Sequence, residues 1–347
     1  MRADLAEGNM EVEIEAHRRT GGAGFAPIFV VGSPRSGTTM LAVLLDRHSR
    51  IAVPPETHFF WKFVPQVRNV WATASREELV DAALGFDRIA DLALERGAVL
   101  KRFEGCDKTV ANLLRVILET YASLRGAVRA GEKSPRHIEC VPDIMEACPD
   151  ARVIAIIRDG RDVVLSRMKQ AWSSRGNPRR FGLFSMEWSD HVRLILELER
   201  KYGPDRFMVV KYESIILDPK PELERMCKFI GEEFEPRQLD PEVDSSTVPV
   251  WEEEWKGKAR STLDPARVEA WRRSGDRDQI WIMNCIMGRM LRRMGYADTG
   301  LGDCRWPKRI RFTVTRMPYT RFIRIWARLG LRLLRRLGFD TAGGMPH

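Results

Sequence analysis

The string GSPRSGTT at residues 32–39 has residue types and spacing that suit the binding of an anion. Its two glycines stand as they do in phosphate-binding loops, where backbone N–H groups at the start of a helix face the ligand. Nucleotide hydrolases carry a lysine directly after the second glycine, which reaches the outer phosphates of ATP. This chain has Thr38 there, and its cation, Arg35, comes three residues earlier. The loop therefore predicts an anion cradle for a nucleotide other than ATP.

A second polar set follows an apolar run at 152–157. Arg158 opens the string RDGRD, and Ser166 comes eight residues later in a pattern that predicts a helix. Arginine offers a bidentate fork to phosphate oxygens and serine adds a hydroxyl donor, so these residue types suit a phosphate monoester dianion. Arg161 and Arg167 are expected to be solvated or ion-paired instead.

Two residues after the first helix could act as a general base. Glu56 follows two prolines, which stiffen a non-helical segment that could hold a base in place. The aromatic residues at 59–61 are expected to bury its carboxyl partly and to raise its pKa toward the working range of a base. His58 is the alternative, because the unperturbed pKa of imidazole already suits the task. A helix cap or a surface carboxylate is the non-catalytic interpretation of Glu56.

Lys133 is predicted to stand at the carboxyl end of a strand. A short strand that starts near Val128 leads to EKSP at 132–135, and Pro135 ends it. Doubly wound sheets place their ligands outside the carboxyl ends of their strands. A lysine taken by itself is more often a surface charge, so its role depends on this placement.

The elements that must position these residues alternate between strand and helix. Apolar runs at 28–31 and 152–157 predict strands, and 207–216 predicts another strand that enters a turn before a helix closed by Gly231. The pattern predicts an α/β fold with a P-loop-like, doubly wound, mostly parallel central sheet flanked by helices. In the helix after the anion loop, the apolar residues expected on one face are Met40, Leu41, Leu44 and Leu45.

These segments together resemble the sulfotransferases that use 3'-phosphoadenosine 5'-phosphosulfate (PAPS). GSPRSGTT is similar to their 5'-phosphosulfate loop, closest to the arginine-containing loop of the tyrosylprotein-type and bacterial branch. The strand-RDGRD-helix unit, EKSP and KYESIILDP at 211–219 are similar to further segments of that family, and the resemblance covers about residues 27–296. Tyr212 and Glu213 in KYESIILDP are expected to brace the site.

The resemblance implies in-line transfer of a sulfuryl group from PAPS to a hydroxyl or amine, without a metal. It makes Glu56 the general base in preference to His58, and it brings Lys133 to the transferring group or the leaving phosphate. Arg158 and Ser166 would hold the 3'-phosphate. The basic loop at 256–260 resembles a late segment that closes over the nucleotide. The cofactor-binding residues implied are Arg35, Ser36, Gly37, Thr38, Thr39, Arg158, Ser166 and Lys258.

Residues 61–126 predict helices only, at 77–84, 89–100 and 109–124, with Thr109 or Asp107 as the cap of the last. Given the resemblance, this helical insertion would form a wall or lid over the acceptor, or serve only as scaffold. The acceptor itself is open among small molecules, lipids, carbohydrates and peptide tyrosine.

Composition is that of an ordinary globular protein, with 347 residues, 44% hydrophobic and 30% charged. Six cysteines without a CxxC pair argue against a zinc site and a disulfide framework, so they are expected to be mostly reduced and buried in a cytoplasmic protein. Residues 1–25 contain no apolar run suited to export or membrane crossing and are expected to be a disordered leader. The sulfotransferase-like domain is expected at 26–300.

The segment at 301–347 forms a basic tail. Residues 305–339 contain eleven Lys or Arg and no acid, so the formal charge of +9 for the whole chain leaves −2 elsewhere. From Arg321 onward, apolar and basic residues fall on opposite faces of a helical projection, which is typical of a helix lying on a membrane surface. Peripheral contact with the inner face of a membrane is one expectation, docking on the protein's own domain is the other, and nucleic acid is not expected as a partner.

Two other classes of function remain open. A P-loop kinase would share the cradle, but it should need Mg²⁺ and a lysine where this loop has Thr38. A non-catalytic, membrane-associated nucleotide-binding protein would account for the tail but would leave Glu56, Arg158 and Ser166 without a role.

Overall fold

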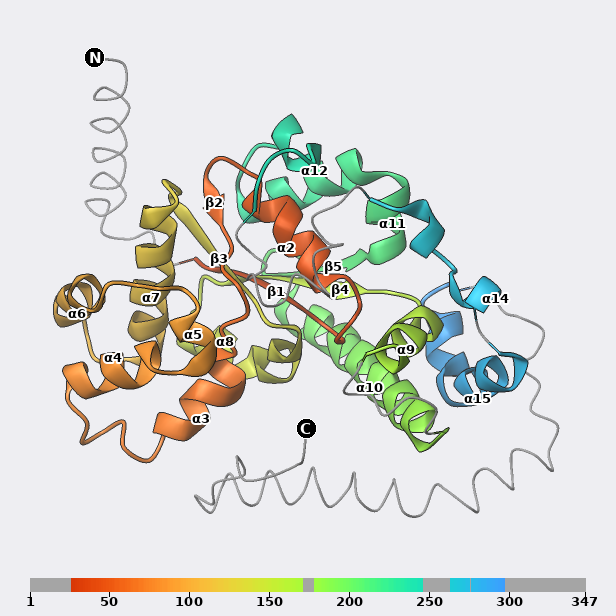
Figure 1. Ribbon diagram of the computed structural model, residues 1–347, viewed down its shortest axis with the longest axis horizontal. Coiled ribbons are helices and arrows are strands. Elements are labelled where there is room, and N and C mark those ends of the chain that lie inside the picture. The colour runs from red at the N-terminus through yellow and green to blue at the C-terminus, as the bar shows by residue number, and fades with distance from the viewer. Residues whose placement is uncertain (1–25, 171–177, 246–262, 275, 297–347) are drawn as a thin grey trace.

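The computed structural model describes residues 26–170, 178–245, 263–274 and 276–296 (Figure 1). The predictions for the leader at 1–25, for Lys258 and for the tail at 301–347 lie outside these residues. Within them, no helix is long and apolar enough to cross a membrane.

The centre of the fold is a five-stranded sheet in the order β2-β3-β1-β4-β5, in which every neighbouring pair is parallel. This confirms the predicted α/β fold with a doubly wound central sheet. The strand order reverses at β1, so the ends of β1, β3 and β4 lie together at the position where such sheets bind ligands. The strands are β1 (Ile28–Gly32), β2 (Ile51–Ala52), β3 (Arg129–Lys133), β4 (Arg152–Ile157) and β5 (Phe207–Lys211).

Helices cover both faces of the sheet and bury a separate hydrophobic core on each (Figure 1). Side chains alternate between the two cores along β1, because successive residues of a strand point to opposite faces. Ile28 and Val30 pack in the core beneath α2 (Thr38–Asp46), whereas Phe29 and Val31 pack in the larger core on the other face.

The larger core lies beneath most of the helices. Among them are α7 (Val110–Leu124), α8 (Val141–Ala147), α9 (Gly160–Met168), α10 (Pro178–Tyr202) and α15 (Arg277–Arg293). On the other face, α11 (Tyr212–Leu217) and α12 (Pro219–Ile230) lie with α2. Short 3-10 turns complete the described chain at η2 (Pro135–Cys140), η4 (Pro236–Leu239) and η7 (Pro265–Arg267), and α14 (Trp271–Ser274) follows.

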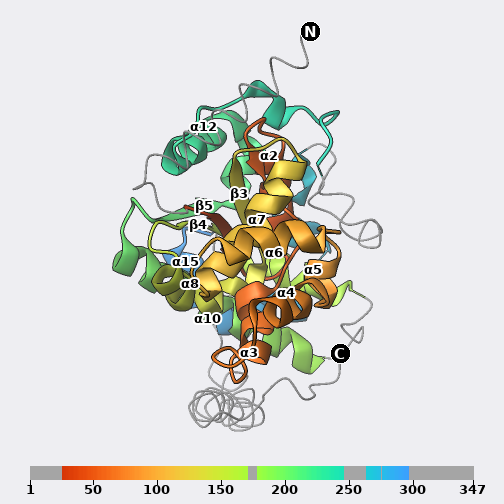
Figure 2. The same ribbon diagram turned by 90° about the vertical axis from the view of Figure 1, so that its left-hand side faces the viewer.

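The insertion forms a helical layer at one end of the molecule, on the left in Figure 1 and toward the viewer in Figure 2. The predicted helix at 89–100 is wrong, because two helices occupy it. The chain breaks at Ala93, where φ is +49°, and the Glu95 carboxylate then caps the next helix through Gly97 N at 2.7 Å. Its helices are η1 (Phe59–Phe63), α3 (Val64–Val67), α4 (Arg76–Leu84), α5 (Asp87–Ala90), α6 (Arg96–Glu104) and α7, which Thr109 caps as predicted.

Two further predictions need correction. The helix after the anion loop buries nearly all of its residues rather than one face, because η4 packs against it. The strand predicted at 207–216 ends at Lys211, and α11 follows directly.

The cysteines mostly follow the prediction. Cys106, Cys140, Cys148 and Cys227 are free thiols, and all but Cys106 are buried. Burial raises the pKa of Cys148 to about 12. Cys285 departs from the prediction because it is disulfide-bonded.

Candidate active site

The anion loop connects β1 to α2 and points the start of that helix at the carboxyl edge of the sheet. Gly37 takes the left-handed conformation at φ +101° and lies against the ring of Tyr212, where a Cβ atom would come within 2.5 Å of Cδ2. Only glycine fits such a close approach. No side chain caps α2, so the N–H groups of its first turn, including those of Thr38 and Thr39, are placed to receive an anion.

Two serine hydroxyls in the loop fit the same ligand. Ser33 and Ser36 are 2% and 1% exposed, and neither hydroxyl has a hydrogen-bond partner among the described residues. An unsatisfied buried hydroxyl is destabilising, so each needs an acceptor that a bound phosphate or sulfate would provide. The loop therefore fits a bound phosphate or sulfate, in line with the anion cradle that its residues predicted.

Lys133 and Glu56, which are 77 residues apart in the sequence, are in direct contact. Lys133 Nζ donates to Glu56 Oε1 at 2.8 Å and lies 3.4 Å from Thr39 Oγ1 of the loop. The lysine is fully buried, and β3 ends at it as predicted, opposite Val30 of β1. The structure thus brings a cation, a carboxylate and the anion loop together.

His58 completes this group rather than standing apart from it. Its Nε2 lies 3.0 Å from Glu56 Oε2, and its side chain is buried. Burial lowers the pKa of His58, although the hydrogen bond to Glu56 opposes this effect. A neutral ring that donates Nε2–H to Glu56 follows, and Nδ1 has no partner among the described residues.

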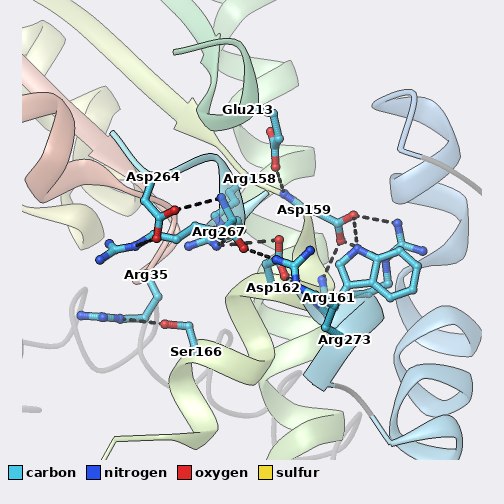
Figure 3. Close-up of polar contacts among 12 residues, drawn as sticks. Arg35, Arg158, Asp159, Arg161, Asp162, Ser166, Glu213, Asp264, Arg267 and Arg273 are labelled. Carbon is cyan, nitrogen blue, oxygen red and sulfur yellow. Dashed lines mark hydrogen bonds and ion pairs between the residues drawn. The ribbon is translucent and has the colours of Figure 1, made fainter. Parts of the chain in front are cut away.

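The third group lies along α9 and the turn before it, and contains the predicted phosphate ligands (Figure 3). Arg35 Nε donates to Ser166 Oγ at 3.3 Å, which joins the anion loop to this helix. Arg158 does not contact Ser166; its Nη2 donates to Arg267 O at 2.8 Å and lies 3.7 Å from Asp162 Oδ2. Its guanidinium also lies over the ring of Tyr212, 4.3 Å from the centroid.

Arg158 keeps a donor that makes no hydrogen bond to the described residues. Its Nε is buried without a hydrogen-bond partner there. A phosphate dianion would supply the missing acceptor. The residues present therefore fit a nucleotide that carries a phosphate near Arg158 and a second anion in the loop.

Tyr212 and Glu213 brace the two loops, as expected. Glu213 Oε1 accepts from Asp159 N at 2.9 Å and so holds the turn of RDGRD, and Oε2 accepts from Tyr296 OH at 3.1 Å. Burial raises the pKa values of Glu213 and of Tyr212.

The two other arginines of this segment are ion-paired and buried rather than solvated. Arg161 pairs with Asp159 at 2.7 Å and lies 3.8 Å from the ring centroid of Trp271. Arg167 Nη1 lies 3.0 Å from Glu187 Oε2. Of the two predicted alternatives, solvated or ion-paired, both arginines take the second.

Comparisons with known proteins decide among the classes that share such a cradle. The pattern that describes the sulfotransferase family matches residues 27–236. This chain belongs to the sulfotransferase family. Its match spans the anion loop, Glu56, Lys133, Arg158 and Ser166.

Relatives of this sulfotransferase-family chain include protein-tyrosine sulfotransferases. That of Drosophila melanogaster is 26% identical over 208 residues, which cover 58% of this chain and 37% of that protein. Protein-tyrosine sulfotransferase 2 of Gallus gallus is 26% identical over 211 residues, which cover 59% of this chain and 50% of that protein. The chain thus spans half or less of the length of these relatives.

Solved structures share the fold. The sulfotransferase domain of the Synechococcus PCC 7002 olefin synthase gives a TM-score of 0.55 at 22% identity and covers 79% of this chain and 95% of its own. The sulfotransferase domain from the curacin biosynthetic pathway gives a TM-score of 0.55 at 20% identity. The match covers 78% of this chain and 98% of that domain. The central sheet with its helical layers is therefore a sulfotransferase fold.

Sequence reasoning missed two buried residues at this site. Glu132 is fully buried beside Lys133, and Trp271 donates from Nε1 to Asp159 Oδ2 at 3.1 Å. The short strand predicted there gave no indication that the Glu132 carboxylate would be buried. Nothing local distinguished Trp271 from other tryptophans. Among the described residues no cluster of three or more His, Cys, Asp or Glu side chains could hold a metal ion.

Proposed function

We propose that this chain is a sulfotransferase that transfers a sulfuryl group from PAPS to a hydroxyl or amine of an acceptor. The contact that carries the proposal is the one between Lys133 and Glu56 at 2.8 Å, beside Thr39 of the anion loop. It provides a cation for a leaving phosphate and a base for an acceptor within one buried group. Membership of the sulfotransferase family supports the same reaction.

The nucleotide is held at two anionic groups. The loop residues Arg35, Ser36, Gly37, Thr38 and Thr39 receive the 5'-phosphosulfate, through N–H groups and the unsatisfied serine hydroxyl. Arg158 and Ser166 receive the 3'-phosphate, and the unsatisfied donor on Arg158 Nε supports this role. Lys258 would add a contact from the segment outside the described residues.

PAPS supplies the sulfuryl group on a phosphate leaving group. Glu56 accepts the proton of the attacking hydroxyl, while His58 donates to its other oxygen and orients it. The new bond joins the acceptor oxygen to sulfur, and the bond from sulfur to the 5'-phosphate oxygen breaks. Lys133 stabilises the negative charge that moves onto that phosphate. Lys133 Nζ lies beside both Glu56 and Thr39, so one ammonium connects the base with the loop that receives the leaving phosphate.

The acceptor is a small molecule, a lipid or a carbohydrate with a reactive hydroxyl, and the names of the relatives extend the range to tyrosine side chains. The insertion helices α3 to α7 follow Glu56 directly, which supports their forming the acceptor side. We place the enzyme in the cytoplasm, with peripheral membrane contact through the basic segment at 305–339. A lipid acceptor would agree with that location.

Thermal unfolding with 3'-phosphoadenosine 5'-phosphate (PAP) tests nucleotide recognition. At a hundred times its Kd, a ligand adds about 2.7 kcal/mol to the free energy of unfolding. We expect PAP to raise the unfolding temperature and ADP, which lacks the 3'-phosphate, to have little effect. Stabilisation by ATP with Mg²⁺ instead would indicate a kinase, and no response to any of them would favour a non-nucleotide function.

Substitutions test the catalytic roles. Glu56→Gln should lower kcat by roughly 10²-fold to 10⁴-fold with PAP binding retained, because it removes only the general base. Glu146→Gln, on the exposed side of α8, is the control and should be unaffected. An Arg35→Ala variant that bound PAP as tightly as the unmodified protein would contradict the assignment of the loop.

A further inference from the structure

Glu132 stands next to Lys133 on β3, but the proposed reaction makes no use of it. Its side chain is fully buried. Oε1 accepts hydrogen bonds from Thr57 Oγ1 at 2.8 Å and from Ser134 Oγ at 2.6 Å, and Oε2 lies 2.7 Å from His137 Nδ1. Each of these groups can supply a hydrogen. An ionised carboxylate, which only accepts, matches this set of donors.

The groups that reach Glu132 also hold the backbone that follows Glu56. Thr57 N lies 3.4 Å from Glu132 Oε1, and the next three N–H groups reach the same carboxylate through one side chain each. Four consecutive N–H groups at the start of η1 therefore end on Glu132. The three relayed contacts are His58 N to Ser134 Oγ at 3.1 Å, Phe59 N to Thr57 Oγ1 at 3.2 Å and Phe60 N to His137 Nε2 at 3.2 Å.

Two neighbouring residues at the end of β3 thus hold Glu56, the proposed base, and Thr57, the residue after it. Adjacent side chains of a strand point to opposite faces, so Lys133 meets Glu56 while Glu132 meets Thr57. The turn that follows Glu56 and Thr57 is costly, because His58 takes φ +52° without being glycine. A strained turn persists only where its surroundings fix it.

We propose that Glu132 is a positioning residue, whose ionised carboxylate fixes the turn after Glu56 and thereby sets where Glu56 meets Lys133. This inference rests on the proposed function in taking Glu56 as the base. Glu132 acts through the backbone and needs no contact with either substrate.

The direction of the hydrogen bonds requires the negative charge. His137 Nε2 accepts from Phe60 N, so the proton of this ring is on Nδ1, the atom that lies 2.7 Å from Glu132 Oε2. A neutral amide at this position would place an N–H group against one of the existing donors. Burial raises the pKa of Glu132, but the contacts with His137, Ser134 and Thr57 outweigh it and leave the pKa below its ordinary value.

The variant Glu132→Gln, which preserves shape and removes the charge, tests this role. We expect kcat to fall by about 100-fold, because a small displacement of a catalytic group costs that much, while the KM for PAPS stays within about two-fold. Amide hydrogen exchange across 57–60 should become at least about ten times faster, because these N–H groups lose their acceptor. Glu187→Gln is the matched control, since Glu187 is a largely buried carboxylate paired with Arg167 and Arg136.

The control should lose stability without faster exchange at 57–60 and without a comparable loss of kcat. Glu132→Gln with kcat within about three-fold of the unmodified protein, or with unchanged exchange, would overturn the inference. If the unmodified protein transfers no sulfuryl group, the proposed function fails, but the exchange measurement still tests the role of Glu132. If Glu132→Gln does not fold, Ser134→Ala removes one relay alone. Faster exchange at His58 N would then support the inference, and unchanged exchange would refute it.

Discussion

Gly37 is the residue at which the anion loop, α2 and Tyr212 approach most closely. Its φ of +101° and the Tyr212 ring leave no room for a side chain. We expect Gly37→Ala to lower the free energy of unfolding by about 3 kcal/mol and to weaken PAP binding, because strain and steric overlap add. Gly203→Ala is the control: φ there is +72° with nothing within 4 Å, so only about 1 kcal/mol should be lost. Urea unfolding and PAP titration of both variants measure the difference, and equal losses would contradict it.

Asp162 makes stability depend on pH. It accepts from Trp271 N at 2.7 Å, and burial raises its pKa from 3.8 to about 6. The folded protein therefore binds this proton more tightly than the unfolded chain does, so the stability it contributes is present at low pH and is lost as pH rises from about 4 to about 6. The difference from the ordinary value corresponds to roughly 3 kcal/mol.

Asp162→Asn removes the carboxyl group that titrates and keeps an oxygen that can accept from Trp271 N. Relative to the unmodified protein, the variant should therefore gain up to roughly 3 kcal/mol between pH 4 and pH 7. Urea unfolding of both proteins at the two pH values gives the comparison, in which contributions from other groups cancel. A stability difference that stays constant with pH would show that Asp162 does not retain its proton in the folded protein.

At the scale of elements, the segment that contains η7 and α14 holds the turn of RDGRD from outside. Arg158 donates to Arg267 O, and Trp271 bonds both Asp162 and Asp159 while its ring lies against Arg161. Trp271→Ala should cost about 3 kcal/mol of stability and weaken PAP binding about ten-fold, because Arg158 loses the support of this segment.

Lys220→Ala is the control for that experiment. Its ion pair with Glu224 on α12 is exposed at both ends and contributes less than about 1 kcal/mol. Calorimetric titration with PAP measures both variants. A Trp271→Ala protein that binds PAP normally would show that the segment supports the fold but not the site.

At the scale of the whole molecule, the charge of the chain is concentrated in one segment. Residues 305–339 carry all of the net positive charge, and each basic residue near an anionic bilayer adds about 1 kcal/mol of binding. We expect the full chain to co-sediment with vesicles of phosphatidylserine and phosphatidylcholine, and a chain ending at residue 304 not to. Both should show the same stabilisation by PAP. Equal sedimentation of the two would contradict the membrane role, and loss of PAP binding on truncation would indicate docking on the domain instead.

The sequence by itself determined the elements whose signal is local. Apolar runs predicted β1 and β4, a short strand ended by Pro135 predicted β3, and the loop after β1 follows from its glycines. The residues at the ends of these strands, Lys133 and Arg158, were therefore predicted correctly at one edge of the sheet. Alternating strands and helices predict a parallel sheet, in which the carboxyl ends of all strands lie at one edge, so this placement follows without knowledge of any long-range contact.

Only the tertiary structure decided which of these residues touch and what else is buried with them. Arg35 meets Ser166 across 131 positions of the chain, and Glu132 meets Thr57 across 75. Whether a carboxylate is buried depends on such distant partners, because its charge is tolerated only where donors surround it. Glu132 and Trp271 therefore had no reliable sequence signal, whereas the anion loop carries its chemistry in its own eight residues.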